Sequence, residues 1–284
     1  MMHLLEALII NPFLHMAILA GIAASIASGI VGSYIVVKRI VFISGSIAHS
    51  ILGGMGLFLW LKRTYAVEWL SPLYGALLAA LISAILIGWI HLKYREREDT
   101  VIAMLWSTGM SNGVIFVALT PGYNVELMNY LFGNILWASS SDIQMLFALD
   151  LIVVAVVFFA HQKFLAICFD EQQARLQKIS VQFYYLLLLC LVALSVVLLI
   201  QVVGAILIIA MLAIPAAIAS SLTHRFSIMM VLAVLMGCFF SCLGTAASYE
   251  LNWPPGATIA LTAALFYLLN CLIKKKRGKI TYVF

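Results

Sequence analysis

Long runs of apolar residues recur along the whole chain and are separated by short polar segments. Most runs reach about 20 residues, the length that an α-helix needs to cross the hydrocarbon core of a bilayer. We therefore predict an all-α, polytopic transmembrane helical bundle of about nine spans, with eight as the alternative count. The expected spans are residues 10–36, 41–60, 72–92, 101–119, 142–162, 182–200, 202–222, 228–248 and 256–273.

Two segments depart from this simple pattern. Residues 126–140, "ELMNYLFGNILWASS", are too short and too polar for a further span, and they fit a re-entrant or interfacial helix on the outer side. The junction at "IQVVG" near Gln201 is either the meeting point of two spans or a helix broken around a cavity.

Composition agrees with the hydropathy pattern. Hydrophobic residues make up 65% of the 284-residue chain and charged residues only 10%, too few to cover the surface of a water-soluble domain of this size. No long polar linker divides the chain, so we expect a single transmembrane domain over residues 1–284. The start of the chain has no basic residue before its apolar run, which favours a retained first span over a cleaved signal peptide. The five cysteines form no CxxC and no zinc-type spacing.

The distribution of basic residues predicts the orientation of the bundle. With the C-terminal "KKKRGK" in the cytoplasm and the N-terminus outside, only Lys62 and Arg63 of the 16 Lys and Arg residues lie on the outer side. The basic isoelectric point, about 9.0, then follows from membrane orientation, and no basic face remains that would indicate nucleic-acid binding. We expect a multi-pass protein, in contact with lipid, of a bacterial cytoplasmic (inner) membrane.

One histidine stands inside the second expected span, in "SGSIAHSILGGMG". An ionisable side chain at membrane depth indicates a functional site, because placing it in hydrocarbon is costly. His49 either relays protons or ligates a metal, or it is a neutral imidazole hydrogen-bonded to a nearby carbonyl or to a serine such as Ser44, Ser46 or Ser50. The glycines that follow, from Gly53 to Gly56, let a neighbouring helix or a solute come close.

Other ionisable residues are weaker candidates for a functional site within the membrane. Asp150, about two turns inside the fifth expected span, is either a cavity carboxylate or the partner of a polar group across a helix interface. Glu250 ends the eighth span and is typical of an interfacial carboxylate. His91 and His224, beside basic residues at the predicted cytoplasmic ends, are expected to be solvated.

Two further patterns concern packing and docking. The first span carries small residues four apart, and such rows let helices approach closely in lipid. The row comprises Gly21, Ser25, Gly29 and Ser33, with Ala24, Ser28 and Gly32 in parallel. The segment 163–180 contains "DEQQARLQK", which predicts a short amphipathic helix that is either a solvated connector or a docking element.

The chain has no GxxxxGK[ST], GxSxG or HExxH pattern, so it carries no ATPase site of that kind and no hydrolase signature. We therefore expect a transport subunit that is not an enzyme and binds no cofactor of its own. Its energy would come from a partner subunit or from an ion gradient.

Five blocks, in order over about residues 10 to 275, resemble the membrane permeases of ATP-binding-cassette importers for zinc, manganese and iron. "SGSIAHSILGGMGL" is similar to the second-span motif of that family, and "LMNYLFGNIL" followed by Asp142 is similar to its Leu-Phe-Gly segment. "FDEQQA" is similar to its cytoplasmic Asp-x-x-x-Ala motif. "VGAILIIAMLAIPAAIA" and "NWPPGATIAL" are similar to its last two blocks.

The resemblance implies a permease that moves a divalent metal ion along the axis of a dimer, formed with a second copy or a paralogue. It implies a cytoplasmic ATPase partner that holds the ATP and an extracytoplasmic metal-binding protein that delivers the ion. His49 would belong to the metal path, and Asp170, Glu171 and Ala174 to the helix that receives the ATPase motion. Asp150 and Glu250 remain additional candidates for the path.

Two positions depart from the family pattern. Gly45 stands where the family often has an aspartate one turn before the histidine, so the metal would need other ligands. Lys178 stands where the family usually has a glycine. The alternatives are an ATP-binding-cassette permease for a metal chelate or siderophore, an ion-gradient-driven carrier and an intramembrane enzyme. A gradient-driven carrier would be expected to show paired carboxylates at the midplane, and no nucleophile–base set for catalysis can be assembled.

Overall fold

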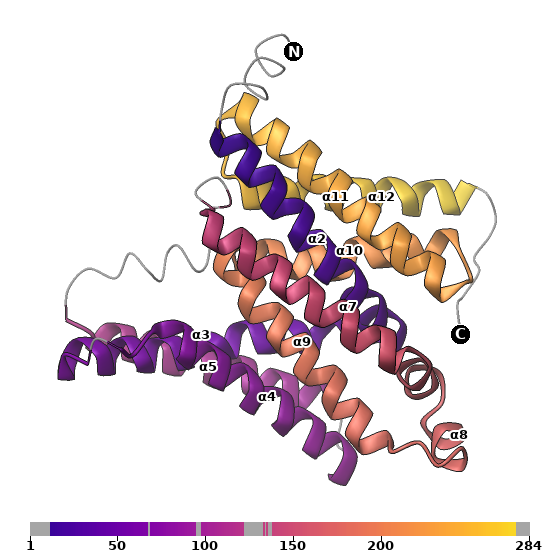
Figure 1. Cartoon of the computed structure of the whole chain (residues 1–284), viewed down its shortest axis with the longest axis horizontal. Coiled ribbons are helices and arrows are strands. Elements are labelled where there is room, and N and C mark those ends of the chain that lie inside the picture. Colours follow the sequence, from indigo (N-terminus) through magenta and orange to yellow (C-terminus); the bar gives the residue numbers. More distant parts are fainter. Residues whose placement is uncertain are drawn as a thin grey trace.

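The computed structural model describes residues 12–67, 69–94, 98–121, 133, 135 and 138–276, and within these ranges the elements are helical (Figure 1). Nine of the described helices are long and apolar enough to cross a membrane, which confirms the predicted count. They are α2 (Pro12–Lys38), α3 (Val41–Tyr65), α4 (Pro72–Tyr94), α5 (Glu98–Leu119), α7 (Ser140–Phe169), α9 (Val181–Val203), α10 (Ala205–Leu222), α11 (Phe226–Leu251) and α12 (Pro255–Lys276). A short helix, α8 (Glu171–Leu176), follows α7.

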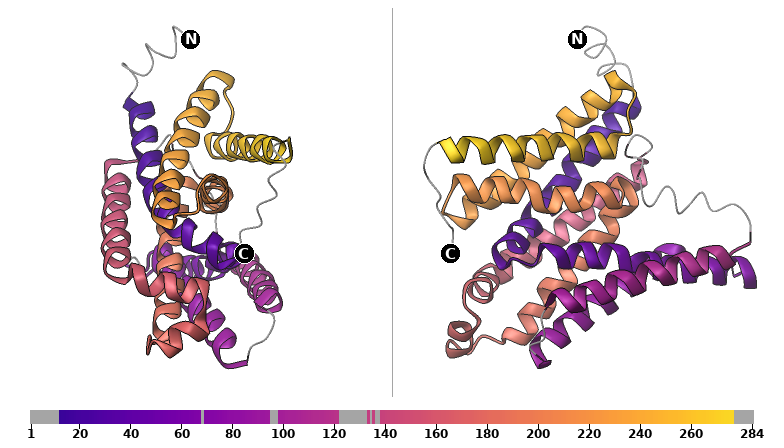
Figure 2. Two further views of the ribbon diagram at one scale, coloured as in Figure 1. Left: turned by 90° about the vertical axis from the view of Figure 1, so that its right-hand side faces the viewer. Right: turned by 180° about the vertical axis from the view of Figure 1, so that it is seen from behind.

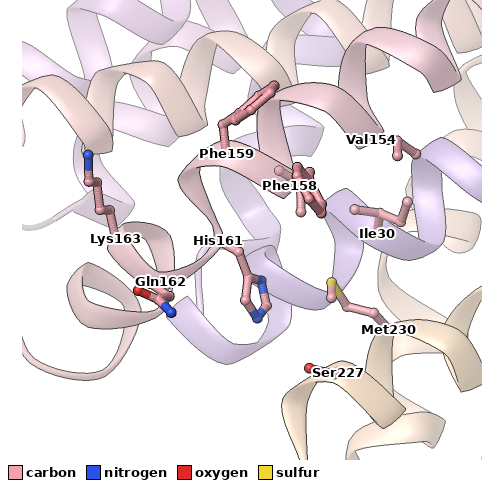
Figure 3. Close-up of a pocket in the computed structure, with 10 residues that line it drawn as sticks. Ile30, Val154, Phe158, Phe159, His161, Gln162, Lys163, Ser227 and Met230 are labelled. Atoms are coloured by element: carbon pink, nitrogen blue, oxygen red, sulfur yellow. The ribbon is translucent and has the colours of Figure 1, made fainter.

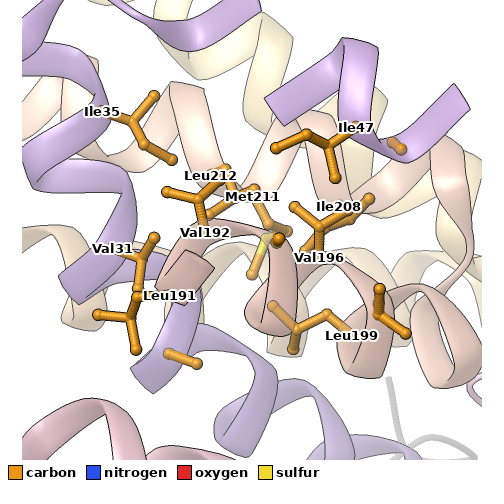
Figure 4. Close-up of a cluster of buried hydrophobic side chains, with 14 of the residues drawn as sticks. Val31, Ile35, Ile47, Leu191, Val192, Val196, Leu199, Ile208, Met211 and Leu212 are labelled. Carbon is orange, nitrogen blue, oxygen red and sulfur yellow. The ribbon is translucent and has the colours of Figure 1, made fainter. Parts of the chain in front are cut away.

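The centre of the bundle is an apolar core in which α2, α3, α9 and α10 meet (Figure 4). Ile47 of α3 and Val196 of α9 are fully buried there, beside Met211 of α10. Helix α9 is the most apolar span by hydropathy and is largely enclosed, as expected for a helix that is apolar on all sides.

The small residues of α2 lie in contacts with two other helices. A methyl group added at Gly29 would lie 2.7 Å from the backbone nitrogen of Val234, so α2 and α11 approach backbone to backbone. Gly21 packs against the side chain of Ser241 in α11, and the Ser25 hydroxyl lies 3.4 Å from the hydroxyl of that serine. Gly32, on the parallel row, faces Leu212 of α10. The two rows therefore serve two different neighbours.

Glycines also join α3, α4 and α5 into one arm of the molecule, which extends away from α11 and α12 in both views (Figures 1 and 2). A methyl group at Gly53 of α3 would lie 2.9 Å from the carbonyl oxygen of Gly109 in α5, and Gly54 packs against Gly75 of α4. The glycines after His49 therefore admit neighbouring helices, one of the two uses that the sequence allowed.

The junction near Gln201 is a sharp change of direction between two helices. Gly204 separates α9 from α10 with φ +86°, a backbone conformation that favours glycine. Helix α10 then continues through Pro215 to Leu222. Of the two alternatives for "IQVVG", the structure has two spans that meet at one residue. Most of segment 126–140, with its predicted interfacial helix, lies outside the described residues.

Candidate functional site

His49 lies on α3 with its imidazole stacked on the indole of Trp106 from α5. The ring centroids are 4.3 Å apart and the planes differ by 16°. A methyl group at Gly45, one turn earlier, would lie 3.6 Å from the same indole ring. Trp106 therefore covers both His49 and Gly45, the position at which the permeases that the sequence resembles often carry an aspartate.

The serines around His49 use their hydroxyl hydrogens elsewhere. Ser44 donates to the Val41 carbonyl, Ser46 to the Ile102 carbonyl of α5, and Ser50 to the Ile47 carbonyl. Ser83 of α4 in turn donates to the Ser50 hydroxyl. Among the described residues, no hydrogen bond joins the His49 imidazole to these serines, and their hydroxyl hydrogens are used elsewhere. The imidazole of His49 is half-buried and lies beside the indole ring of Trp106.

Helix α5 exposes a row of polar side chains in the middle of its span: Ser107, Thr108, Ser111 and Asn112. Ser46 contacts Ile102 and Gly53 meets Gly109, so His49, between them on α3, lies at the level of Trp106 and Ser107. Such a row does not suit contact with lipid, because polar side chains at membrane depth face protein or water. We refer to these four residues as the α5 polar row.

The α5 polar row has oxygen atoms suited to contact with a cation or its water. Ser107 and Thr108 both donate to the Met104 carbonyl, at 3.1 and 2.7 Å, so their hydrogens are held within the helix. Their oxygen lone pairs remain able to accept from water or to face a cation. Within the described ranges, no three His, Cys, Asp or Glu side chains come together as a metal site.

The structure places Asp150 and Glu250 away from this surface. Asp150 of α7 is 6% exposed and lies beside the backbone of Ala27 in α2, and among the described residues its carboxylate oxygens have no hydrogen-bond partner. Glu250 is exposed in the last turn of α11. His49 therefore lies at the level of the α5 polar row, whereas the carboxylates of Asp150 and Glu250 lie on α7 and α11.

The segment "FDEQQA" forms the end of α7 and the short helix α8. Asp170 is the N-cap of α8 and accepts from the backbone nitrogens of Gln172 and Gln173, at 2.8 and 3.0 Å. Ala174 is buried beneath the helix. Lys178 ends the turn with φ +59°, in the left-handed region, while Ile179 donates to the Ala174 carbonyl. Lys178 thus has a left-handed backbone conformation at the position where the permeases that the sequence resembles usually have glycine.

Glu171 points inward from α8 and ties it to two spans. Its Oε1 accepts from Lys38 Nζ at 2.6 Å, at the end of α2, and lies 3.6 Å from His91 Nε2, at the end of α4. Lys38 also donates to the Ile167 carbonyl of α7 at 2.8 Å. His91 and Lys38 lower the pKa of the Glu171 carboxyl to about 2. His91 also packs on Tyr185, so the expectation of a solvated His91 was wrong.

The exposed surface of α8 consists of polar side chains around one apolar side chain. Leu176 is 85% exposed, next to Arg175, and Gln172 and Gln173 are exposed beside it. Neither predicted acidic residue presents its carboxylate outward as an isolated charge, because Asp170 caps the helix and Glu171 binds Lys38. Ala174 supports the helix from below.

Sequence reasoning missed three features: the α5 polar row, Trp106 and His161. The α5 polar row could have been found from "WSTGMSNG", a cluster of polar and small residues inside a span. Trp106 gave no signal, because its contact with His49 depends on how α5 packs on α3. His161 of α7 was also missed, and its Nδ1 lies 2.7 Å from the hydroxyl of Tyr34.

Comparisons with known proteins agree on one class. The model of the family described as the ABC 3 transport family matches residues 11–274. A "Probable metal transport system membrane protein" of Chlamydia pneumoniae is 47% identical over 93% of this chain and 89% of its own length. The manganese transport system membrane protein MntC of Listeria monocytogenes is 31% identical over 96% and 95%. In the structure of PsaBC from Streptococcus pneumoniae in complex with Fab, one chain superposes with a TM-score of 0.81 at 29% identity, over 94% of both chains.

Proposed function

Because this chain belongs to the ABC 3 transport family, we propose that it is the membrane path through which a divalent metal ion, Mn²⁺ first among them, is imported. The observation that carries the proposal is the half-buried His49, stacked on Trp106 at the level of the α5 polar row. A lone imidazole beside exposed hydroxyl and amide groups suits an ion that must bind and leave again.

The choice of manganese rests on ligand chemistry and on a relative. Oxygen ligands such as carbonyl groups and water suit Mn²⁺, whereas thiolates select zinc or iron–sulfur centres and imidazole also suits zinc and iron. In the described residues no cysteine joins His49 in a ligand cluster. The relative named a manganese transport system membrane protein supports the same ion, and zinc and iron are the competitors to be tested.

We propose three partners for the chain: an ATPase, a metal-binding protein and a second permease. A cytoplasmic ATPase would bind α8 through Leu176 and the exposed polar residues around it. An extracytoplasmic metal-binding protein would deliver the ion, and a second permease copy or a paralogue would close the path opposite the α5 polar row. The chain itself would supply no catalytic group, and ATP would be hydrolysed on the partner.

The test is metal uptake by vesicles that contain the permease with its ATPase and metal-binding protein. We expect ⁵⁴Mn²⁺ uptake to fall at least about tenfold in His49→Ala, with assembly of the complex unchanged, and unlabelled Mn²⁺ to compete better than Zn²⁺. The matched control is His15→Ala, an exposed histidine in the first turn of α2. Normal uptake by His49→Ala would remove His49 from the path, and preferential competition by Zn²⁺ would replace manganese as the cargo.

A further inference from the structure

A basic hollow lies at the end of the bundle that holds α8, between the ends of α2, α7 and α10 and the start of α11. Its volume is about 670 Å³. Four basic side chains line it: Lys38, Arg39, His224 and Arg225. Among the lining residues that the structure describes there is no carboxylate, although Lys38 is also engaged by Glu171 on α8. Such a rim attracts an anion.

The walls of the basic hollow are mainly apolar, with the hydroxyl groups of Ser220 and Thr223 among them. Val36 and Val37 of α2 and Phe226 and Met229 of α11 line it, together with Phe169 at the end of α7, which is 64% exposed. A small inorganic anion would gain nothing from these walls. An amphiphile with an anionic headgroup would use both the charged rim and the apolar sides.

A second hollow, of about 520 Å³, lies farther along three of these helices, α2, α7 and α11 (Figure 3). Ile30, Val154, Phe158 and Met230 surround its apolar part. Ile30 is eight residues before Lys38 on α2, which places it roughly 12 Å further along the helix axis. That offset is the distance over which a phospholipid passes from its headgroup into its acyl chains.

We infer that this edge of the permease binds an anionic phospholipid of the leaflet next to α8. The phosphate group lies in the basic hollow near Arg225 and His224, and an acyl chain lies along Ile30, Val154 and Phe158. Basic pockets between membrane helices recognise anionic headgroups by this combination of charge and depth. The site is separate from His49, so its failure would leave the proposed metal path untouched.

The test is native mass spectrometry of the full-length permease in detergent, titrated with phosphatidylglycerol or phosphatidylcholine. We expect phosphatidylglycerol to be retained preferentially, and Arg225→Gln to lower its affinity about fivefold without changing that for phosphatidylcholine. Arg225 is the N-cap of α11 without a side-chain capping bond, so the helix start should survive the substitution. The matched control is Arg175→Gln, an exposed arginine on α8 outside the hollow.

A second variant tests the deeper hollow without altering charge. Met230→Trp should fill it and weaken the retention of both lipids, whereas the preference for phosphatidylglycerol should persist. Equal retention of phosphatidylglycerol by Arg225→Gln and Arg175→Gln would overturn the inference. Displacement of the lipid by millimolar inorganic phosphate would also overturn it, in favour of a small-anion site. Loss of ATPase binding in Arg225→Gln without any change in lipid retention would assign the rim to the partner instead.

Discussion

At the scale of single residues, the contact between Trp106 and His49 governs the environment of the candidate metal path. The indole lies flat on the imidazole and reaches over Gly45, so one side chain occupies space next to both positions. A metal that reaches His49 must therefore take its other ligands from water, from the α5 polar row or from another subunit. Weak, incomplete coordination of this kind is compatible with rapid release.

We predict that Gly45→Asp restores an aspartate–histidine pair and slows release of the ion. The added Cβ has ordinary van der Waals space beside Trp106, and the carboxylate would lie on the same helix face as His49, four residues later. The half-saturating Mn²⁺ concentration for uptake should fall about tenfold, with a lower maximal rate. Gly45→Asn adds similar bulk without charge and is the control. Identical kinetics for the wild type and Gly45→Asp would contradict the proposed role of this face.

A second prediction concerns Lys178, whose φ of +59° lies in a region that L-residues with a Cβ avoid. Lys178→Gly should raise the free energy of unfolding by about 0.5 to 1 kcal/mol, because relief of backbone strain exceeds the added entropy of the unfolded chain. Thermal unfolding in detergent measures the change. Lys178→Ala keeps the Cβ and should give no such gain. Equal stabilisation by both substitutions would contradict relief of backbone strain as the cause.

At the scale of elements, the helix α8 is held by its neighbours more than by its own six residues. A helix this short has little intrinsic stability, so α8 depends on its N-cap and on the contacts of Glu171 with other helices, which we call its tether. Asp170 supplies the cap, and Glu171 connects it to the ends of α2 and α4. Since α3 begins at Val41, three residues after Lys38, the tether links the predicted docking helix to the helix that carries His49.

We predict that Glu171→Gln uncouples ATP hydrolysis from uptake, because α8 loses its charged anchor while its exposed surface stays the same. Metal moved per ATP hydrolysed should fall several-fold, with ATPase binding retained. Asp99→Asn removes an exposed carboxylate near the start of α5 and serves as the control. Full coupling in Glu171→Gln would show that the tether plays no part in transmission.

The same carboxylate predicts a pH dependence. The folded pKa of Glu171, about 2, is below its ordinary value of 4.5, so its stabilising contribution is complete above about pH 4.5 and is lost as the pH falls through 2. The difference in melting temperature between the wild type and Glu171→Gln should therefore shrink as the pH falls below about 4.5. A difference that grew as the pH fell below about 4.5 would contradict this assignment.

At the scale of the whole molecule, the arm formed by α3, α4 and α5 carries the candidate path on its outer side. α11 and α12 lie on the other side of the central core (Figure 2). The α5 polar row is on the surface of the described structure, so in the membrane it requires water or a second protein surface opposite it. This is the physical basis for the proposed dimer.

We predict that cysteines on the α5 polar row cross-link two copies of the permease. In a chain whose five native cysteines are serine, Ser111→Cys should form dimers with a bismaleimide spacer of about 10 Å, because both copies would face one water-filled path. Phe158→Cys is the control, since that side chain is 78% exposed on α7. Dimers from Phe158→Cys alone would place the interface on the other face.

The spans, their number and the position of the α8 segment were determined by the sequence itself. Hydropathy is a property of each residue and its solvent, so nine apolar runs predict nine helices without knowledge of contacts. Only the tertiary structure decided that Trp106 covers Gly45 and His49, that Glu171 points toward Lys38, and that the polar face of α5 stays exposed. In lipid, the lateral arrangement of helices depends on close packing between residues far apart in the chain, as at Gly53 and Gly109, and a linear pattern does not encode those pairings.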